Sequence, residues 1–267
     1  MRIVALLALR NEAIYLPRCL DHLAGQGVET CIIDNGSTDG SGDIAEHYRG
    51  RGVIRIEQFP YPGFYDWTGI LKLKERLAAT IDADWFIHHD ADEIREAPSP
   101  WNTLIEGVAA LDAQGYNAIN FDEFVFVPTE EQDDHEGSDF VSTMRYYYFF
   151  QPRALHRVNA WKKCDGQVDL ISEAGHQACF ADRKIAPQSF VLRHYMVLSR
   201  SHLLRKYLHE RVYSRHEVEE LGWHGWRARL ADRPVHLPSR AALKDVSAGG
   251  WDRSQPFVTH WSFQDGA

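Results

Sequence analysis

The first part of the chain alternates between short apolar runs and helical patterns. An unbroken apolar run, Ile3 to Leu9, is typical of a strand buried on both faces of a parallel sheet, and we expect that strand over Arg2–Leu9. Residues 13–25 carry leucines at helical spacing before Gly25-Gln26-Gly27, which predicts a helix that ends at the glycines. Residues 29–33 then form the next short apolar run, so the opening of the chain reads strand, helix, strand.

The same alternation continues for another fifty residues. Residues 53–57 and 85–88 predict two more strands, and residues 43–48 and 70–81 have helical patterns. Strands that alternate with helices favour an α/β architecture whose strands are parallel. We therefore predict a Rossmann-like, mostly parallel central sheet flanked by helices.

The second half of the chain has a different pattern. Residues 116–127 and 144–150 are rich in aromatic and β-branched residues, which indicates strands that need not be parallel to the first set. Residues 129–139 form an acidic loop, and residues 201–226 carry a helical apolar stripe with many basic side chains. We expect one α/β domain over residues 1–200 and a C-terminal helical extension over residues 201–267 packed on it.

Composition and charge exclude several classes of protein. The chain has 267 residues, 44% of them hydrophobic and 25% charged, which rules out a mostly disordered chain. Its net charge of −9 argues against a protein that coats nucleic acid, so no nucleic-acid partner is expected. The apolar run at the start is too short to span a bilayer and has no cleavage site after it. The four cysteines form no C-x-x-C pair, which fits reduced thiols in a cytoplasmic protein.

Polar residues follow three of the predicted strands in a coordinated way. They are Arg10-Asn11-Glu12, Asp34-Asn35-Gly36-Ser37 and Asp90-Ala91-Asp92-Glu93. A single aspartate at the end of a strand is commonly a helix cap or a turn former. Three such ends together predict one crevice, because open α/β sheets bind ligands beyond the carboxyl ends of their strands.

The residue types at these three ends suit a nucleotide and a metal ion. Asp34 offers an acceptor for the imide N–H of a pyrimidine, and Asn11 could hold the rest of the base. Asp90 and Asp92 are two residues apart, so in an extended segment both carboxylates point to the same side. Mg²⁺ and Mn²⁺ prefer oxygen ligands and usually take one or two protein carboxylates together with phosphate oxygens.

These stretches resemble the family 2 glycosyltransferases, which are nucleotide-diphospho-sugar transferases of the GT-A fold. The resemblance covers about the first hundred residues and rests on Val4–Glu12, Cys31–Gly40 and Trp85–Glu93, in the order in which the family has them. It implies a donor-binding half over about residues 1–100 and an acceptor half over about residues 101–200.

The resemblance also implies roles for individual residues. Asp34 would contact the base, Asp90 the ribose or the water shell of the metal ion, and Asp92 the ion that bridges the two phosphates. Lys74, on the helix before Asp90, would face the nucleotide, although a solvated lysine is an equally simple interpretation. The donor-binding set is completed by Asn11 and Glu12.

The second half of the chain matches the family less closely. Family 2 enzymes often carry a late acidic motif that supplies the catalytic base, with a histidine about twenty residues later that helps to hold the metal ion. Glu173 and His194 have this spacing, so Glu173 is the predicted base and His194 a third metal ligand. The usual Glu-Asp pair is absent, which leaves Asp169, Asp122 and Glu123 as alternative bases.

The expected activity is a metal-dependent, inverting transfer of a sugar to a carbohydrate or lipid-linked acceptor, with Mn²⁺ or Mg²⁺ as the cofactor. A basic amphipathic helix around residues 203–212 could lie on the inner face of the membrane or pack on the domain. A nucleotidyltransferase and a noncatalytic nucleotide-sugar-binding module are the alternative functions. A third alternative is a His-Asp phosphohydrolase using His88, His89 and Asp90, against which the strand-like residues 85–87 argue.

Overall fold

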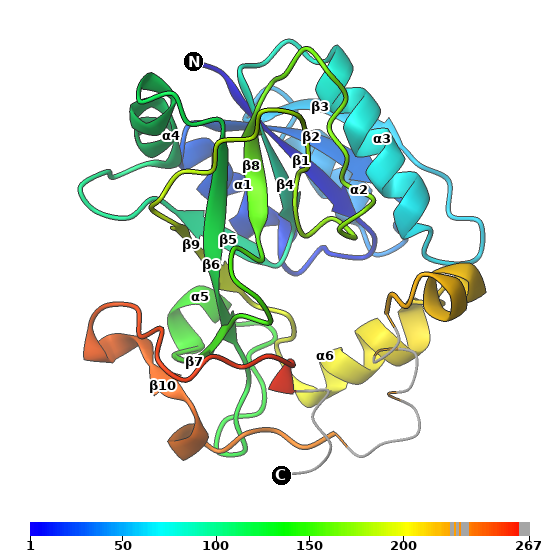
Figure 1. The fold of residues 1–267 in the computed structure, drawn as a ribbon. Coiled ribbons are helices and arrows are strands. Elements are labelled where there is room, and N and C mark those ends of the chain that lie inside the picture. The colour runs from blue at the N-terminus through cyan, green and yellow to red at the C-terminus, as the bar shows by residue number, and fades with distance from the viewer. Residues whose placement is uncertain (225–226, 228–229, 231–234, 262–267) are drawn as a thin grey trace. The chain divides into compact units, whose positions relative to one another are not determined.

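A computed structural model describes residues 1–261 with the exception of residues 225–226, 228–229 and 231–234 (Figure 1). The chain forms two compact units. Unit 1 contains Met1–Tyr61, Trp67–Asp122 and Leu155–Leu192, and unit 2 contains Pro62–Asp66, Glu123–Ala154 and Arg193–Ala267. The chain passes between the units several times, so each unit is assembled from segments that are distant in the sequence.

Unit 1 is built on a sheet with helices on both faces. Its strands are β1 (Ile3–Leu9), β2 (Val28–Asp34), β3 (Val53–Gln58), β4 (Trp85–Asp90), β5 (Glu93–Glu96), β8 (Val158–Lys162) and the first parts of β6 (Ala118–Phe126) and β9 (Phe190–His194). Its helices are α1 (Leu16–Gly25), α2 (Ser41–His47), α3 (Trp67–Thr80) and α4 (Leu104–Ala113). The strand order is β6-β8-β4-β1-β2-β3, and β5 pairs with β9.

The first four strands are parallel, as the alternating pattern predicts. Beyond them β8 runs antiparallel to both β4 and β6, so the prediction of a mostly parallel sheet is wrong and the sheet is mixed. Parallel strands require a long crossover connection, usually through a helix. The second half of the chain has only the four-residue helix α5 (Phe140–Thr143) between β6 and β8, which is too little for such a crossover.

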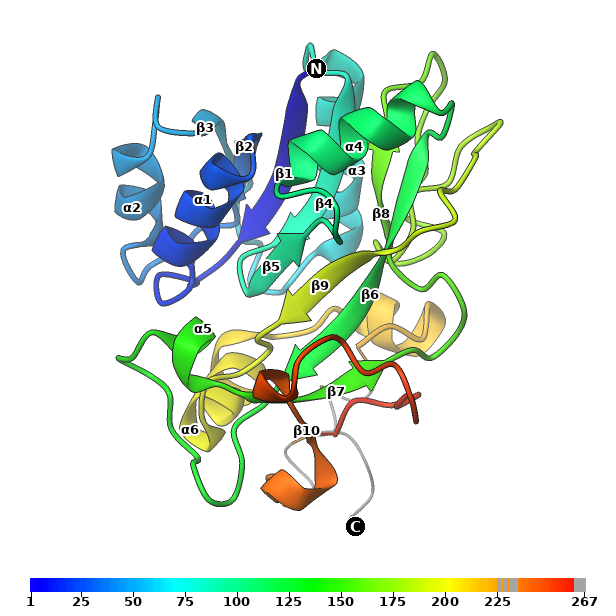
Figure 2. The same cartoon turned by 90° about the vertical axis from the view of Figure 1, so that its left-hand side faces the viewer.

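The connections explain why helices cover both faces of the sheet. From β1 the chain moves through α1 to β2 and through α2 to β3, and α3 then returns it to β4 on the other side of β1. Right-handed crossovers in opposite directions place their helices on opposite faces. Figure 2 accordingly shows α1 and α2 in front of the sheet and α3 behind it.

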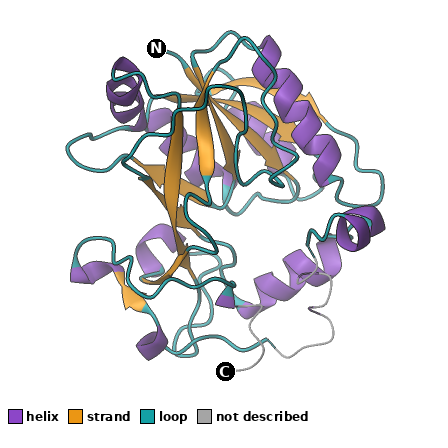
Figure 3. Cartoon of the chain, viewed as in Figure 1, coloured by secondary structure: helices purple, strands orange, loops and turns teal. Residues whose placement is uncertain are grey.

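Unit 2 combines a small antiparallel sheet with short helices. The sheet has the order β10-β7-β6, formed by β10 (Lys244–Asp245), β7 (Tyr146–Phe150) and the second part of β6. The helix α6 (Arg200–Leu204) continues as a π-helix over Arg205–Glu210, and a second π-helix covers His216–Glu220. Figure 3 shows these helices in purple beside the orange strands.

Among the described residues, the C-terminal helical extension predicted over residues 201–267 is not evident as such, because a strand and short turns follow the helices. The second π-helix ends at Glu220, and Gly222 just after it adopts a positive φ of 69°, which ends a helix readily. Over residues 240–248 the chain forms two short 3-10 turns and the strand β10, which pairs with β7. The apolar stripe in residues 201–226 correctly predicted helical structure near its start, but it carries no information about the strand β10.

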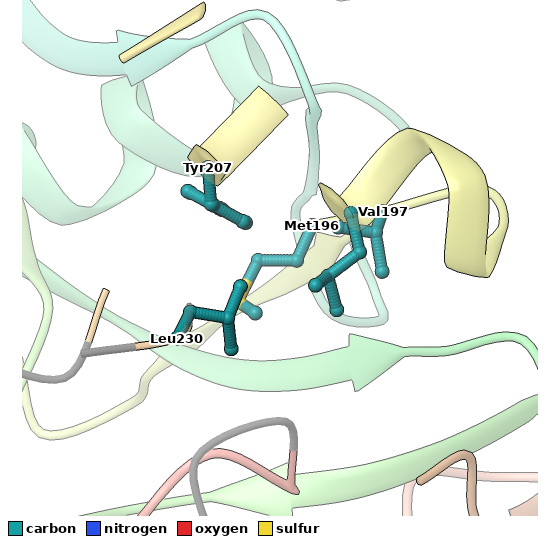
Figure 4. Close-up of a cluster of buried hydrophobic side chains, with 5 residues drawn as sticks. Met196, Val197, Tyr207 and Leu230 are labelled. Atoms are coloured by element: carbon teal, nitrogen blue, oxygen red, sulfur yellow. The ribbon is translucent and has the colours of Figure 1, made fainter. Parts of the chain in front are cut away.

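The apolar stripe of α6 packs inside unit 2. Leu203 and Tyr207 are buried together with Met196, Val197 and Leu230, four of which are labelled in Figure 4. This packing accounts for the amphipathic pattern of the segment without a membrane surface. Among the described residues, we find no helix with the length and apolar character needed to cross a membrane.

Replacement of Leu6 by alanine tests the central position of β1. Leu6 is fully buried, with 0% of its surface exposed, so the cavity left by its side chain is expected to lower the free energy of unfolding by about 3 kcal/mol. Urea denaturation measures this loss. Ile14→Ala is the control, because Ile14 is 37% exposed and its truncation should cost less than about 1 kcal/mol.

Candidate active site

The acidic ends of β2 and β4 lie at one edge of the sheet in unit 1. Both strands pair with β1, which lies between them: Asp34 is opposite Leu9 of β1, and Asp90 is opposite Ala8. Neighbouring strands are about 4.8 Å apart, so the backbones of Asp34 and Asp90 are separated by about 10 Å. This edge is where the order of the strands changes direction, and α/β sheets form their binding crevices at such a point.

The loops that follow β1 and β2 hold each other in place. The backbone N–H groups of Asn11 and Glu12 donate to the hydroxyls of Ser37 (3.1 Å) and Ser41 (2.9 Å). In return, the side-chain oxygen of Asn11 accepts from the N–H of Thr38 at 2.8 Å. The side chain of Asn11, predicted to contact the base, thus uses its oxygen to join the two loops.

Asp34 is buried at the end of β2, with 5% of its surface exposed. One carboxylate oxygen accepts from the backbone N–H of Ser37 at 2.9 Å, which fixes the direction of the side chain. The other oxygen lies close to Gly42 at the start of α2, since a Cβ atom at that position would come within 3.5 Å of it. The carboxylate is held in a polar turn, as a group with a defined acceptor role would be.

Arg10 and Tyr61 form a contact beside this turn that the sequence did not reveal. The guanidinium carbon of Arg10 lies 3.5 Å from the centroid of the Tyr61 ring. The same guanidinium donates to the carbonyls of Asn35 (2.8 Å) and Gly36 (2.5 Å). Arg10 stands in the motif after β1 and Tyr61 in an aromatic loop, but only the fold brings the two together.

The segment after β4 carries Asp90 and Asp92. Asp92 is 8% exposed and Asp90 is partly exposed. Glu93 is almost fully buried, and its carboxylate accepts from the backbone N–H of Asp90 at 3.1 Å and from Arg95 at 2.6 Å. The turn that bears the two aspartates is therefore bonded to a buried ion pair behind it.

His88 and His89 are buried on opposite faces of the sheet. His88 meets the edge of the Trp67 ring at 5.6 Å, and Nδ1 of His89 accepts from Arg95 at 3.0 Å. Burial lowers the pKa of both imidazoles well below its usual range, and the charges of Lys74 and Arg95 lower it further. Both histidines are buried on the strand β4, whereas the His-Asp phosphohydrolase alternative requires an all-helical fold.

Lys74 is completely buried on α3 and points at the end of β4. Its ammonium lies 3.4 Å from Nδ1 of His88 and donates to the carbonyl of His89 at 3.3 Å. Burial lowers the pKa of Lys74 from 10.5 to about 8, against the opposing charges of Asp90 and Glu93. The lysine is thus not a solvated surface group.

Glu173 lies in a sharply turned loop of unit 1. The two residues after it, Ala174 and Gly175, have positive φ angles of 52° and 82°. Gly175 packs so closely on Trp67 that a Cβ atom would come within 2.9 Å of the ring, and Trp67 donates to the carbonyl of Ala174 at 2.9 Å. The loop is rigidly placed, and the partly exposed Glu173 is placed with it.

Two of the alternative bases make hydrogen bonds within unit 1. The carboxylate of Asp169 accepts from the N–H groups of Ile171 and Ser172, both at 2.9 Å. Burial raises the pKa of Asp169, but these hydrogen bonds outweigh it and lower the pKa overall. Asp122 accepts from Asn120 at 3.4 Å. Asp169 therefore caps the loop that carries Glu173.

Glu123 and His194 form a pair in unit 2. Nδ1 of His194 lies 2.6 Å from the carboxylate of Glu123, which is 1% exposed. The ring of His194 meets that of His260 at 6.3 Å, and His260 is hydrogen-bonded to the hydroxyl of Tyr148 at 2.9 Å. The sequence predicted Glu123 and His194 in unrelated roles, and their contact across 71 residues could not be read from their spacing.

The donor set after β4 fits a divalent ion that arrives with a diphosphate. Asp90 and Asp92 supply hard oxygen ligands, and Mg²⁺ and Mn²⁺ complete such a shell with phosphate oxygens. Within the described ranges, no three or more His, Cys, Asp or Glu side chains gather into a preformed metal site.

The first third of the chain matches a known family. Residues 5–94, from β1 to the segment after β4, match the family model of glycosyl transferase family 2. No curated protein matches the sequence.

Several solved structures are distantly similar. TarS from S. aureus has a TM-score of 0.44 at 13% identity, over 86% of this chain and 44% of that one. TarS 1–349 in complex with UDP has a TM-score of 0.46 at 13% identity, over 74% of this chain and 61% of that one. Glucosyl-3-phosphoglycerate synthase from Mycobacterium tuberculosis, in complex with Mn²⁺, UDP and glucosyl-3-phosphoglycerate, has a TM-score of 0.32 at 21% identity, over 46% and 44%. The chain thus spans less than half the length of TarS, and scores of this size do not establish a shared fold.

The buried charge of Lys74 predicts an unusual dependence of stability on pH. Between about pH 8 and pH 10.5 the unfolded chain holds this proton and the folded chain does not, so stability rises with pH in this window. The full shift corresponds to about 3 kcal/mol. In Lys74→Met this contribution is absent, and the difference in stability between pH 7 and pH 10 should change by about that amount.

Urea unfolding at pH 7 and pH 10 measures the difference. Lys72→Met is the matched control, because Lys72 is exposed on the same helix. An equal effect of pH on the two variants would contradict the assignment of a buried ammonium.

Proposed function

We propose that this chain, whose residues 5–94 match the family model of glycosyl transferase family 2, transfers a sugar from a nucleotide-diphosphate-sugar donor to an acceptor hydroxyl, with a divalent metal ion and with inversion at the anomeric carbon. The observation that carries the proposal is the register of the sheet. It brings Asp34 and Asp90 to one edge, on either side of β1 and inside the matched segment. This is the arrangement expected of a site that holds a base at one end and a diphosphate at the other.

The donor site follows from this arrangement. Asp34 accepts the N–H of the base, and the joined loops around Asn11 and Glu12 shape the surface next to it. Asp90 binds the ribose or a water molecule of the metal shell, and Asp92 is the principal ligand of Mn²⁺ or Mg²⁺. Such an ion, when bound, neutralises the charge that develops on the departing nucleoside diphosphate.

In this proposal Lys74 does not touch the nucleotide, because it is buried beneath the end of β4. Its ammonium donates to the carbonyl of His89 and lies where the charge of Asp90 raises its pKa, so the two groups attract each other. We propose that Lys74 supports the nucleotide site through Asp90 and the end of β4.

The acceptor hydroxyl must lose a proton as it attacks the anomeric carbon. We propose Glu173 as the base, because its loop is fixed by Trp67 and by the cap at Asp169. His194 lies in unit 2 with its Nδ1 held by Glu123, and its role as a further metal ligand stays a prediction from the sequence. The acceptor is a carbohydrate or a lipid-linked sugar.

Thermal shifts with nucleotide sugars test the donor. UDP-, GDP-, dTDP- and CMP-sugars are added with and without Mn²⁺, and we expect one nucleotide to raise the melting temperature, with a larger rise when Mn²⁺ is present. Transfer or hydrolysis of that donor is then measured. Binding without any turnover would indicate a noncatalytic binding module, and the absence of any shift would contradict the proposal.

Replacement of Asp92 tests the metal site. The loss of one ligand should cost several kcal/mol of transition-state stabilisation, so Asp92→Ala is expected to lower turnover by at least about 100-fold while the fold stays intact. Turnover and circular dichroism are measured on the same samples. Asp165→Ala, at an exposed position, is the control and should keep its activity. Full activity in Asp92→Ala would refute the role of Asp92.

Replacement of Asp34 tests the base site separately. In Asp34→Asn the amide oxygen can still accept from Ser37, so the turn is kept while the charge is lost. We expect nucleotide binding to weaken about tenfold both with and without Mn²⁺. Asp92→Ala should instead weaken nucleotide binding only when Mn²⁺ is present. Isothermal titration with the free nucleoside diphosphate measures both, and an effect of Asp34→Asn confined to the Mn²⁺ series would contradict its placement at the base.

A further inference from the structure

We propose that Arg95 is a positioning residue for the turn that carries Asp90 and Asp92. Its buried guanidinium fixes, through Glu93 and the backbone of β4, the segment from which both carboxylates project. The link to metal and nucleotide rests on the proposed function, whereas the network itself is a property of the fold. Arg95 is placed too deep to touch a ligand, with 0% of its surface exposed.

The guanidinium of Arg95 donates to two groups at the end of β4, to Glu93 beside it on β5, and at 3.5 Å to the side-chain oxygen of Asn159. It donates to the carboxylate of Glu93 at 2.6 Å, to the carbonyl of His88 at 3.1 Å and to Nδ1 of His89 at 3.0 Å. The guanidinium carbon of Arg95 also lies 4.4 Å from the centroid of the Phe121 ring. A planar, always charged group can hold three such partners at fixed angles, which a lysine cannot.

Glu93 transmits this constraint to the metal-binding segment. The carboxylate oxygen that pairs with Arg95 also accepts from the backbone N–H of Asp90 at 3.1 Å. This hydrogen bond closes the turn between Asp90 and Glu93, and Asp92 lies inside it. The position of both aspartates thus depends on a carboxylate whose own position is set by Arg95.

The end of β4 is held from its other face as well. Lys74 on α3 donates to the carbonyl of His89, and Arg95 on β5 donates to the carbonyl of His88. Two buried cations therefore bind the last two carbonyls before Asp90, one on each side of the sheet. The backbone that leads into the turn has little freedom to move.

Stability alone does not account for this network. A buried ion pair usually contributes no more to folding than apolar side chains of the same volume, because both charges must lose their hydration. What such a pair does supply is a fixed geometry. We infer that the geometry serves Asp90 and Asp92, which must receive a metal-bound diphosphate without first rearranging.

The chain contains a matched control for Arg95. Arg55 and Glu57 in β3 form an ion pair with the same residue types and the same two-residue spacing, but their side chains are 46% and 29% exposed. Arg55→Met should therefore leave the nucleotide site unchanged, whereas Arg95→Met should alter it.

In Arg95→Met, the order of the turn and the affinity for nucleotides are measured in two independent experiments. Hydrogen exchange reports the Asp90 amide, which should exchange at least about tenfold faster once Glu93 is released. Titration with UDP and with GDP, in the presence and absence of MnCl₂, reports the site. We expect the Mn²⁺-dependent affinity to fall at least about tenfold and the metal-free affinity to change less than about threefold, since Asp34 is held by a separate loop.

Conservative variants keep the proposal testable if Arg95→Met does not fold. Arg95→Lys keeps the charge but loses the fork, and Glu93→Gln keeps an acceptor for the Asp90 amide but loses the ion pair. Both are expected to show smaller losses in the same Mn²⁺-dependent affinity. Unchanged Mn²⁺-dependent affinity in folded Arg95 variants, or an equal loss with and without Mn²⁺, would overturn the positioning role. If the wild-type protein binds neither nucleotide with Mn²⁺, the proposed function fails, and the exchange rate of the Asp90 amide alone decides the claim about the turn.

Discussion

The parallel pairing of β1 with β2 and β4 is the constraint on which the site depends. β1 is buried in the middle of the sheet, so its apolar residues must meet the helices on both faces. A shift of one residue would exchange the side chains packed on the two faces of the strand, and the close packing of differently sized side chains therefore fixes the register. Because Asp34 and Asp90 are the residues at which β2 and β4 end, the same register places both carboxyl groups at one edge. The geometry of the site is a consequence of how the core packs.

The end of β4 shows what this placement requires in electrostatic terms. Acidic side chains grouped at one edge repel one another, and a turn free to move would separate them. Lys74 and Arg95 bring positive charge underneath this segment, and Glu93 ties it to the backbone. Burying Lys74 lowers its pKa to about 8, which is a cost to folding that an apolar residue would not impose. The buried Lys74 thus lowers the stability of the fold, while its hydrogen bond to His89 orders the end of β4.

The sequence predicted those features that depend on local periodicity. The apolar run of β1, the alternation of strands and helices, and the polar residues after β1, β2 and β4 could all be read before the fold was known. Contacts between distant segments could not, since no spacing along the chain encodes the stacking of Arg10 on Tyr61 or the pairing of Glu123 with His194. The two errors have the same origin: the direction of β8 and the pairing of β10 with β7 are decided by which edges remain to be filled.

The same contacts bear on which carboxylate can act as the base. A general base must present its oxygen to the acceptor hydroxyl, within hydrogen-bond reach of the proton that it removes. Glu123 directs its carboxylate at His194 from 2.6 Å, and Asp169 uses its carboxylate to cap the loop at Ile171 and Ser172. Each of these groups orients another part of the protein, and a proton taken up there would break the contact it maintains. Glu173 differs in that the cap at Asp169 and the hydrogen bond from Trp67 to Ala174 fix the loop that carries it, which gives this carboxylate a defined place in unit 1.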